Sequence, residues 1–128
     1  MALADILGVK VAESNPDRYV LHTVVTKDML QPHGVLHGGI SAYLAEHAAS
    51  ECCTKYSDIE KVHFLGLEVS STHLLPILEG DTIETVATPL RKGGRIQYWK
   101  IEQFRLSDGQ MFNVSQMTMY AQKQHPKQ

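Results

Sequence analysis

Residues 31–50 read QPHGVLHGGISAYLAEHAAS, a stretch that passes from a loop into a helix. Pro32 biases Gln31 toward an extended backbone and Gly34 permits a tight bend, so the first residues of the stretch predict a loop. From Ile40 to about Cys53 the chain is rich in alanine and contains neither glycine nor proline. That composition predicts one long helix. Its residues are apolar or small on almost every side, which is typical of a buried helix.

The chain on either side of this helix predicts a mainly β structure. The first ten residues predict a short helix, and residues 19–26 predict a strand rich in Val, Thr and Tyr. Four β-rich segments follow the long helix, at 62–72, 82–88, 96–106 and 111–121. Turn sequences at 91–94 and 107–109 contain Gly-Gly and Asp-Gly pairs, which favour tight antiparallel hairpins. The pattern therefore predicts an α+β domain whose antiparallel sheet wraps a single helix.

Length and composition limit the class of protein. The chain has 128 residues, 43% of them hydrophobic, which fits a single domain over residues 1–122 and a polar tail at 123–128. The 12 basic and 14 acidic side chains nearly cancel, without the Lys/Arg density of a nucleic-acid footprint. No apolar run approaches the ~20 residues of a membrane span, and the N-terminus lacks the basic region of a signal peptide. Because Cys52 and Cys53 are adjacent, a disulfide between them would be strained, so we expect a reduced, cytoplasmic protein.

Glu46 lies in the predicted helix on the same side as Ala42 and Ala49. Buried ionised carboxylates are costly, so such a residue is either a solvent-facing side chain or a functional group. Gly38 and Gly39 precede the helix, where free backbone amides and the helix dipole favour negative charge. Those amides suit an oxyanion hole, beside which a carboxylate can attack a carbonyl or activate water. The alternative is that the glycines only form a tight turn into the helix.

The spacing of Gly38 and Glu46 constrains how they can act together. Eight residues of helix separate their backbones by about 12 Å at 1.5 Å per residue. A catalytic carboxylate and the donor that holds the same carbonyl should both lie within about 3.5 Å of the reacting atoms. A single helix cannot easily meet this condition, whereas two antiparallel helices can pair Gly38 of one with Glu46 of the other. We therefore expect a homodimer with a shared site.

The run from Gln31 to Ser50 resembles the hotdog-fold acyl-CoA thioesterases in the spacing of its Gln, His-Gly-Gly, Glu and Ser. It is most similar to the branch that hydrolyses aromatic acyl-CoAs, which includes the 4-hydroxybenzoyl-CoA, PaaI-type and 1,4-dihydroxy-2-naphthoyl-CoA thioesterases. The similarity continues through residues 66–73, GLEVSSTH, and through the segment 88–99. It implies the hotdog fold, one long central helix wrapped by a curved antiparallel sheet, in chains that pair into dimers and usually into tetramers.

The resemblance implies catalytic roles for four residues. Glu46 would be the nucleophile or general base, and the Gly38 amide would hold the thioester oxygen with help from the Gln31 side chain. Ser50, one helical turn after Glu46, would orient the attacking water or the carboxylate. A thioester is already activated, so we expect no cofactor, coenzyme A being part of the substrate.

Two histidines are also expected near this site. The resemblance implies that His37 and His73 shape and polarise it, with Gly39 contacting the substrate. His33 and His37 are four residues apart, a spacing that would place two metal ligands on one face of a helix. Here they lie in a predicted loop without a third ligand, so we expect no metal.

Arg91, Lys92 and Arg95 surround the predicted glycine hairpin. They are either a solvated turn or a binding site for the phosphates of coenzyme A, which arginine suits well. His47 follows Glu46 but points about 100° away from it, which favours a role in packing or at an interface. Cys52 and Cys53 are best explained as small residues that pack in the helix.

The sequence thus favours an enzyme that hydrolyses an aromatic acyl-CoA to the free acid and coenzyme A. One alternative is a hotdog hydratase or dehydratase, although these use an Asp/His arrangement that does not occur here in that order. Another is a non-catalytic acyl-CoA-binding or regulatory hotdog domain. Such domains usually lack the acid, whereas this chain has Glu46.

Overall fold

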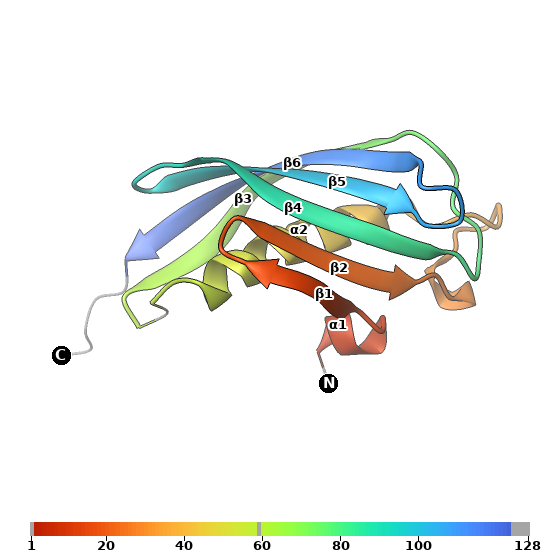
Figure 1. Cartoon of the computed structure of the whole chain (residues 1–128), viewed down its shortest axis with the longest axis horizontal. Coiled ribbons are helices and arrows are strands. Elements are labelled where there is room, and N and C mark those ends of the chain that lie inside the picture. The colour runs from red at the N-terminus through yellow and green to blue at the C-terminus, as the bar shows by residue number, and fades with distance from the viewer. Residues whose placement is uncertain (1, 59, 124–128) are drawn as a thin grey trace.

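A computed structural model describes residues 2–58 and 60–123. In this part of the chain one six-stranded antiparallel sheet arches over a long helix, α2 (Figure 1). The strand order is β1-β2-β4-β5-β6-β3, so β1 and β3 form the two edges. The elements in chain order are α1 (Leu3–Ile6), β1 (Lys10–Asn15), β2 (Arg18–Val24), a 3₁₀ turn (Lys27–Met29), α2 (Gly38–Lys55), β3 (Val62–His73), β4 (Thr82–Lys92), β5 (Ile96–Arg105) and β6 (Met111–Lys123).

This architecture confirms the predicted α+β hotdog fold, with some differences in its bounds. The helix α2 begins at Gly38 rather than Ile40, and β6 continues to Lys123. Of the predicted tail, residues 124–128 lie outside the described part of the chain. The prediction missed β1 because its residues are almost all exposed and show no alternation of apolar and polar side chains.

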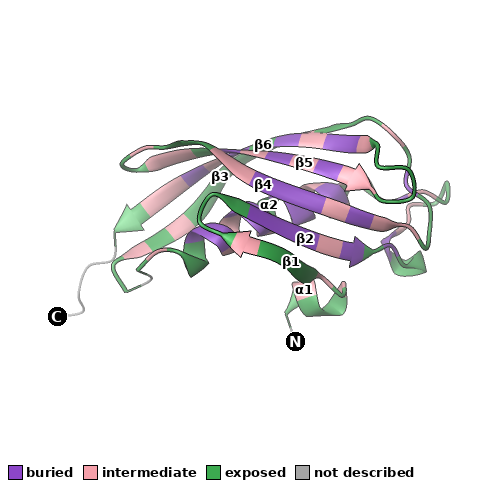
Figure 2. Cartoon of the chain, in the orientation of Figure 1, coloured by how far each residue is buried: buried purple, intermediate pink, exposed green. Residues whose placement is uncertain are grey.

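The core lies between α2 and the concave face of the sheet (Figure 2). Leu44, Ala45 and Ala48 of the helix are fully buried. Because most of the buried helix residues are small, the sheet can approach α2 closely and curve around it. Tyr19 of β2 and Trp99 of β5, each 1% exposed, are the largest side chains that the sheet packs against the helix.

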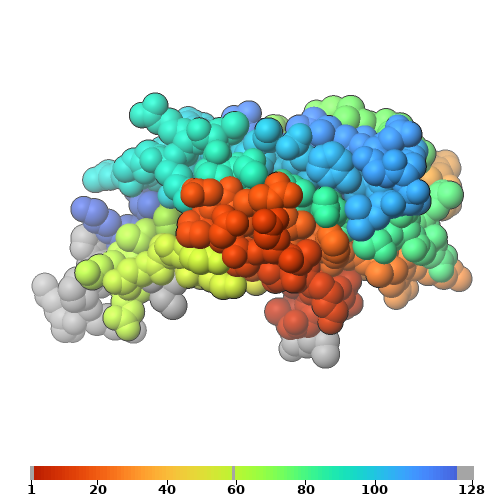
Figure 3. All heavy atoms as spheres, viewed as in Figure 1, coloured from red at the N-terminus to blue at the C-terminus, as the bar shows by residue number. Residues whose placement is uncertain are grey.

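The two edges of the sheet differ in their surroundings. The β1–β2 hairpin lies across one side of the helix, and in the space-filling view its atoms lie between α2 and the β4–β5 hairpin (Figure 3). At the other edge, β3 pairs with β6 on one side only, and its burial pattern is largely exposed. Leu65 and Leu67 of β3 are 47% and 57% exposed. A long, apolar, unpaired edge strand is a surface on which another strand can pair.

Candidate active site

The loop before α2 is held by backbone hydrogen bonds that its last two residues donate. The Leu36 amide donates to the Ile77 carbonyl at 2.8 Å, and the His37 amide donates to the Met29 carbonyl at 2.9 Å. Earlier in the loop Gly34 adopts a φ of 84°, which closes the turn predicted at residues 31–34. The result is a fixed loop that places Gln31 beside the N-terminus of the helix.

The first turn of α2 leaves one amide free. His37 is the N-cap, and its Nδ1 accepts a hydrogen bond from the Gly39 amide at 3.2 Å. The Ile40 amide donates to the His37 carbonyl at 3.0 Å. The Gly38 amide has no acceptor within the described residues. A free N–H at the positive end of an 18-residue helix is suited to bind an oxyanion.

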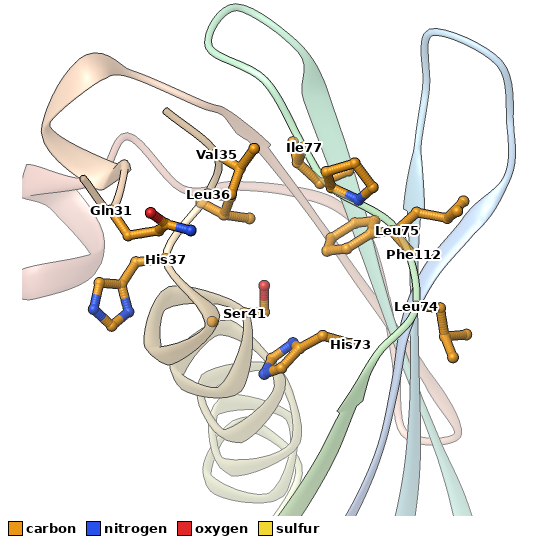
Figure 4. Close-up of a pocket in the computed structure, with 12 residues that line it drawn as sticks. Gln31, Val35, Leu36, His37, Ser41, His73, Leu74, Leu75, Ile77 and Phe112 are labelled. Carbon is orange, nitrogen blue, oxygen red and sulfur yellow. The ribbon is translucent and has the colours of Figure 1, made fainter. Parts of the chain in front are cut away.

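His73, the last residue of β3, packs directly against Gly38. A β-carbon on Gly38 would lie 2.7 Å from His73 Nε2, so only glycine allows this approach. The two histidine rings lie on opposite sides of the helix N-terminus, with His73 on the cavity side (Figure 4). The two histidines predicted together therefore have different positions: His37 caps the helix, and His73 faces the Gly38 backbone.

A cavity of about 420 Å³ opens at this end of the helix. Its polar lining comes from Gln31, His37, Gly38, Ser41 and His73. In Figure 4 the side chains of Gln31, His37, Ser41 and His73 lie around the start of the helix. The rest of the wall is apolar and consists of Val35, Leu36, Leu74, Leu75, Pro76, Ile77 and Phe112. A cavity with this polarity can hold an apolar group with a polar atom at its helix end.

The Gln31 side chain has a defined orientation on the rim. Its Oε1 accepts a hydrogen bond from the His33 amide. Because the backbone amide is a donor, the oxygen of the Gln31 amide must lie on that side. The Nε2 group remains free to donate toward a ligand in the cavity. Gln31, the Gly38 amide and His73 thus form one group of possible hydrogen-bond donors.

Glu46 lies outside this cavity, two helical turns further along α2, and is exposed. Its carboxylate rests over Gly66 of β3, where a β-carbon would lie 3.3 Å from Glu46 Oε2. Gly66 adjoins the irregular step in the pairing of β3 with β6. Ser50 faces the sheet, its Oγ 3.9 Å from Met119 Sδ. The helix is continuous from Gly38 to Glu46, so within one chain these two residues remain apart as expected.

The basic hairpin lies near the C-terminal end of α2, where Lys92 lines a second cavity together with Cys52 and Cys53. None of its residues lines the cavity at Gly38. Lys92 Nζ donates to the Pro16 carbonyl at 2.8 Å and to Asp17 Oδ1 at 3.0 Å. Its ammonium also lies 5.8 Å from the centre of the Trp99 ring. Arg91 and Arg95 are exposed and form no ion pair with other described residues. Lys92 therefore links the β4–β5 hairpin to the β1–β2 hairpin, whereas the positive charges of the two arginines are not paired with other described residues.

The remaining candidates have packing roles. His47 stacks on Tyr43 with ring centres 5.6 Å apart and lies 3.3 Å from Glu51, in agreement with the predicted packing role. Cys52 and Cys53 are buried and unpaired, as expected for small helix residues. Over residues 2–58 and 60–123 no three His, Cys, Asp or Glu side chains gather in a possible metal site. In the same residues no helix is long and apolar enough to cross a membrane.

Comparison with known proteins identifies the family. The family model described as "Thioesterase superfamily" matches residues 33–112, which include the helix, Glu46 and His73. This chain belongs to the thioesterase superfamily. The thioesterase is 33% identical to a 1,4-dihydroxy-2-naphthoyl-CoA hydrolase of Listeria monocytogenes, over 80% of this chain and 81% of the relative. It is 30% identical to 1,4-dihydroxy-2-naphthoyl-CoA thioesterase 2 of Arabidopsis thaliana, over 90% of this chain and 76% of the relative.

A solved structure supports the same assignment of this thioesterase. A thioesterase from Haemophilus influenzae superposes with a TM-score of 0.88 and 28% identity, covering 98% of this chain and 87% of the other. The PaaI protein of Escherichia coli, at 22% identity and a TM-score of 0.84, shares the fold. The expected hotdog-fold thioester hydrolase is therefore confirmed.

Several residues near the site had no signal in the sequence. Asn113 of β6 contacts His73 although 40 residues separate them, because the β3–β6 register places these two residues opposite each other. Phe112, next to Asn113 on β6, lines the cavity, and so does Ser41, three residues after Gly38 in α2. The glycine at position 66 lay in the stretch that resembles the family, but only the three-dimensional structure shows that it underlies Glu46.

Proposed function

We propose that this protein hydrolyses an aromatic acyl-CoA to the free acid and coenzyme A. The observation that carries the proposal is the unpaired Gly38 amide, which faces an apolar cavity beside Gln31 and His73. In the reaction the thioester oxygen accepts a hydrogen bond from this amide at the positive end of α2. The Gln31 Nε2 group donates from the rim of the same cavity.

The acyl group occupies the apolar part of the cavity. Leu36, Ile77 and Phe112 are between 2% and 8% exposed and form a rigid wall. An aromatic ring or a medium-sized chain fits a cavity of about 420 Å³. The aromatic class is also supported by the names of the Listeria and Arabidopsis relatives, which act on 1,4-dihydroxy-2-naphthoyl-CoA.

Glu46 supplies the attack on the carbonyl carbon, as nucleophile or as the base that activates water, with Ser50 one turn further along the helix. Since the Gly38 and Glu46 of one chain are about 12 Å apart along α2, the carboxylate comes from a second copy. The exposed edge strand β3 supports this pairing, because it carries Leu65 and Leu67 and lies beside Glu46. The functional unit in this proposal is a homodimer with two shared sites, and two dimers form a tetramer.

The proposal requires no cofactor, because a thiolate leaves readily from a thioester and coenzyme A arrives with the substrate. Arg91 and Arg95 carry the free positive charge for its phosphates. The two unpaired, buried cysteines support a cytoplasmic location.

The decisive experiment measures release of free thiol from benzoyl-CoA. We expect Glu46→Gln to lower kcat by at least about 10²-fold, comparable to the loss of one main catalytic interaction. The control is Glu51→Gln, a carboxylate on the same helix that lies 3.3 Å from His47. Equal rates for wild type and Glu46→Gln would remove Glu46 from the reaction.

Mixing two inactive variants tests the shared site. One carries Glu46→Ala, and the other carries Gly38→Ala, whose new β-carbon would collide with His73. A heterodimer of the two contains one intact site, formed by the unaltered Gly38 of one chain and the unaltered Glu46 of the other. Random pairing should then restore about a quarter of the wild-type activity. No recovery after refolding of the mixture would refute a site shared between chains.

A further inference from the structure

His73 is joined to a buried polar network that does not reach the cavity. Asn113 is fully buried on β6, and its Nδ2 lies 2.6 Å from His73 Nδ1. The Asn113 amide also contacts Ser71 Oγ, from Nδ2 at 3.0 Å and from Oδ1 at 3.1 Å. Ser115 Oγ donates to Asn113 Oδ1 at 2.9 Å and lies 3.0 Å from Ser71 Oγ. Every polar atom of the buried amide thus has a partner, as burial requires.

This network determines which nitrogen of His73 carries the proton. Since Asn113 Nδ2 donates to Nδ1, the Nδ1 atom must present a lone pair, and a neutral ring then bears its hydrogen on Nε2. Nε2 is the ring atom nearest to Gly38, 2.7 Å from the place that a β-carbon on this residue would occupy.

We propose that Asn113 is a positioning residue that holds His73 in the Nε2–H form, so that His73 acts as a second hydrogen-bond donor beside the Gly38 amide. This inference rests on the proposed function for its catalytic meaning, but the state of the ring is a property of the protein itself. The hydroxyls of Ser71 and Ser115 are hydrogen-bond partners for the rest of the Asn113 amide, whose Nδ2 lies toward His73. The β3–β6 register supports the arrangement, because it places Thr72 opposite Val114 and His73 opposite Asn113.

The first test is spectroscopic and needs no substrate. Long-range proton–nitrogen correlation spectra of ¹⁵N-histidine protein at pH 8 distinguish the Nδ1–H and Nε2–H forms of a ring. The His73 signal is identified by its absence from His73→Gln. We expect the Nε2–H pattern for His73 in the wild-type protein. An Nδ1–H pattern would overturn the inference, whether or not the protein hydrolyses thioesters.

The second test reverses the hydrogen bond with almost no change of shape. In Asn113→Asp the carboxylate can only accept, so the proton moves to His73 Nδ1 and the Nε2–H donor is lost. We expect the spectrum of this variant to lose the Nε2–H pattern. With benzoyl-CoA we expect kcat and kcat/KM to fall together by about 10²-fold to 10³-fold, since removing one oxyanion donor has that effect.

The control is Ser71→Ala, which removes one contact of Asn113 but leaves its hydrogen bond to His73. It should retain the Nε2–H pattern and most of the activity. Should Asn113→Asp fail to fold, the wild-type spectrum alone still decides the form of the ring. If the ring changes form in Asn113→Asp but kcat does not fall, His73 is not a donor in the reaction and the inference is refuted.

Discussion

Replacing Gly66 with alanine should disable Glu46 without touching it. Gly66 lies on β3 directly under the carboxylate, and its missing side chain leaves the space that Glu46 occupies. An alanine β-carbon would lie 3.3 Å from Glu46 Oε2 and 3.7 Å from its Cδ. It would also meet Met117 Cε, the end of a flexible side chain that can turn aside. The carboxylate must therefore shift.

The size of the effect follows from this geometry. Contacts of 3.3 Å require Glu46 to move by a few tenths of an ångström, and more if Met117 does not yield fully. A misplacement of about 1 Å near the reacting atoms costs about 10²-fold in rate. We therefore expect Gly66→Ala to lower kcat by about 10-fold to 10²-fold, which corresponds to roughly 1.4–2.7 kcal/mol in the activation barrier.

The assay compares kcat for benzoyl-CoA in a double-mutant cycle. In the wild-type protein Gly66→Ala should lower kcat by the 10-fold to 10²-fold given above. In Glu46→Gln the same change should alter kcat by less than about 2-fold, because both substitutions act on the Glu46 carboxylate. Gly94→Ala is the control, since no atom lies within 4 Å of its added β-carbon. Urea unfolding shows whether the variant keeps its stability. Losses of equal size in both backgrounds would show that Gly66 supports the fold rather than Glu46.

Three further predictions concern the thiols, the basic hairpin and the cavity wall. Burial raises the pKa of the Cys53 thiol to about 12. The stability that the buried, protonated thiol contributes is therefore present below pH 9 and is lost as the pH rises toward 12. Over this range the urea midpoint should fall less steeply with pH in Cys53→Ala than in the wild-type protein. Lys92 forms an exposed ion pair with Asp17, so Lys92→Ala should lower the free energy of unfolding by at most about 1 kcal/mol. Because its charge is already paired, this change should also raise KM for benzoyl-CoA less than Arg91→Ala does. Leu75→Phe should fill the cavity and reduce kcat/KM for a naphthoyl thioester at least about 10-fold more than for an acetyl thioester, measured side by side.

The long helix and its start were predictable because their signals are local. The alanine-rich run after Ile40 predicts a helix, and the Gly38-Gly39 pair marks its N-terminus. The eight-residue spacing from Gly38 to Glu46 then follows from the rise of a helix alone. β1 was missed for the opposite reason, since an exposed edge strand of mixed composition has no apolar period to detect.

The contacts that complete the site depend on strand register. His73 meets Asn113, and Gly66 lies under Glu46, because β3 packs between β6 and α2. No spacing in a single segment encodes such pairs, so the sequence predicted His73 through its family resemblance and did not reveal Asn113 at all. The same limit applied to Lys92, for which the sequence left a solvated turn and phosphate binding open and did not reveal that its ammonium lies against Asp17 and Trp99.

The positions of Gly66 and His73 on β3 also predict how two copies pair. Within one chain Gly66 lies under Glu46, whereas His73 lies beside Gly38. For Glu46 of one copy to reach Gly38 of the other, Gly66 must lie near His73 of the second copy. In an antiparallel β3–β3 pair the two-fold axis then passes about midway between them, at either Val69 or Ser70, and the residue at the axis faces its own copy.

Cysteine cross-linking tests this register directly. Residues at the axis face their own copies across an antiparallel pair with Cα atoms about 4.5–5.5 Å apart, within the range of a disulfide. Leu65 would be roughly 30 Å from its copy at about 3.4 Å per residue. We therefore expect Val69→Cys or Ser70→Cys to form covalent dimers on oxidation and Leu65→Cys to remain monomeric on a denaturing gel. The native Cys52 and Cys53 are buried and do not interfere. Cross-linking that peaks at residue 65 instead would place Glu46 far from Gly38 of the other copy, and the shared site would then be impossible.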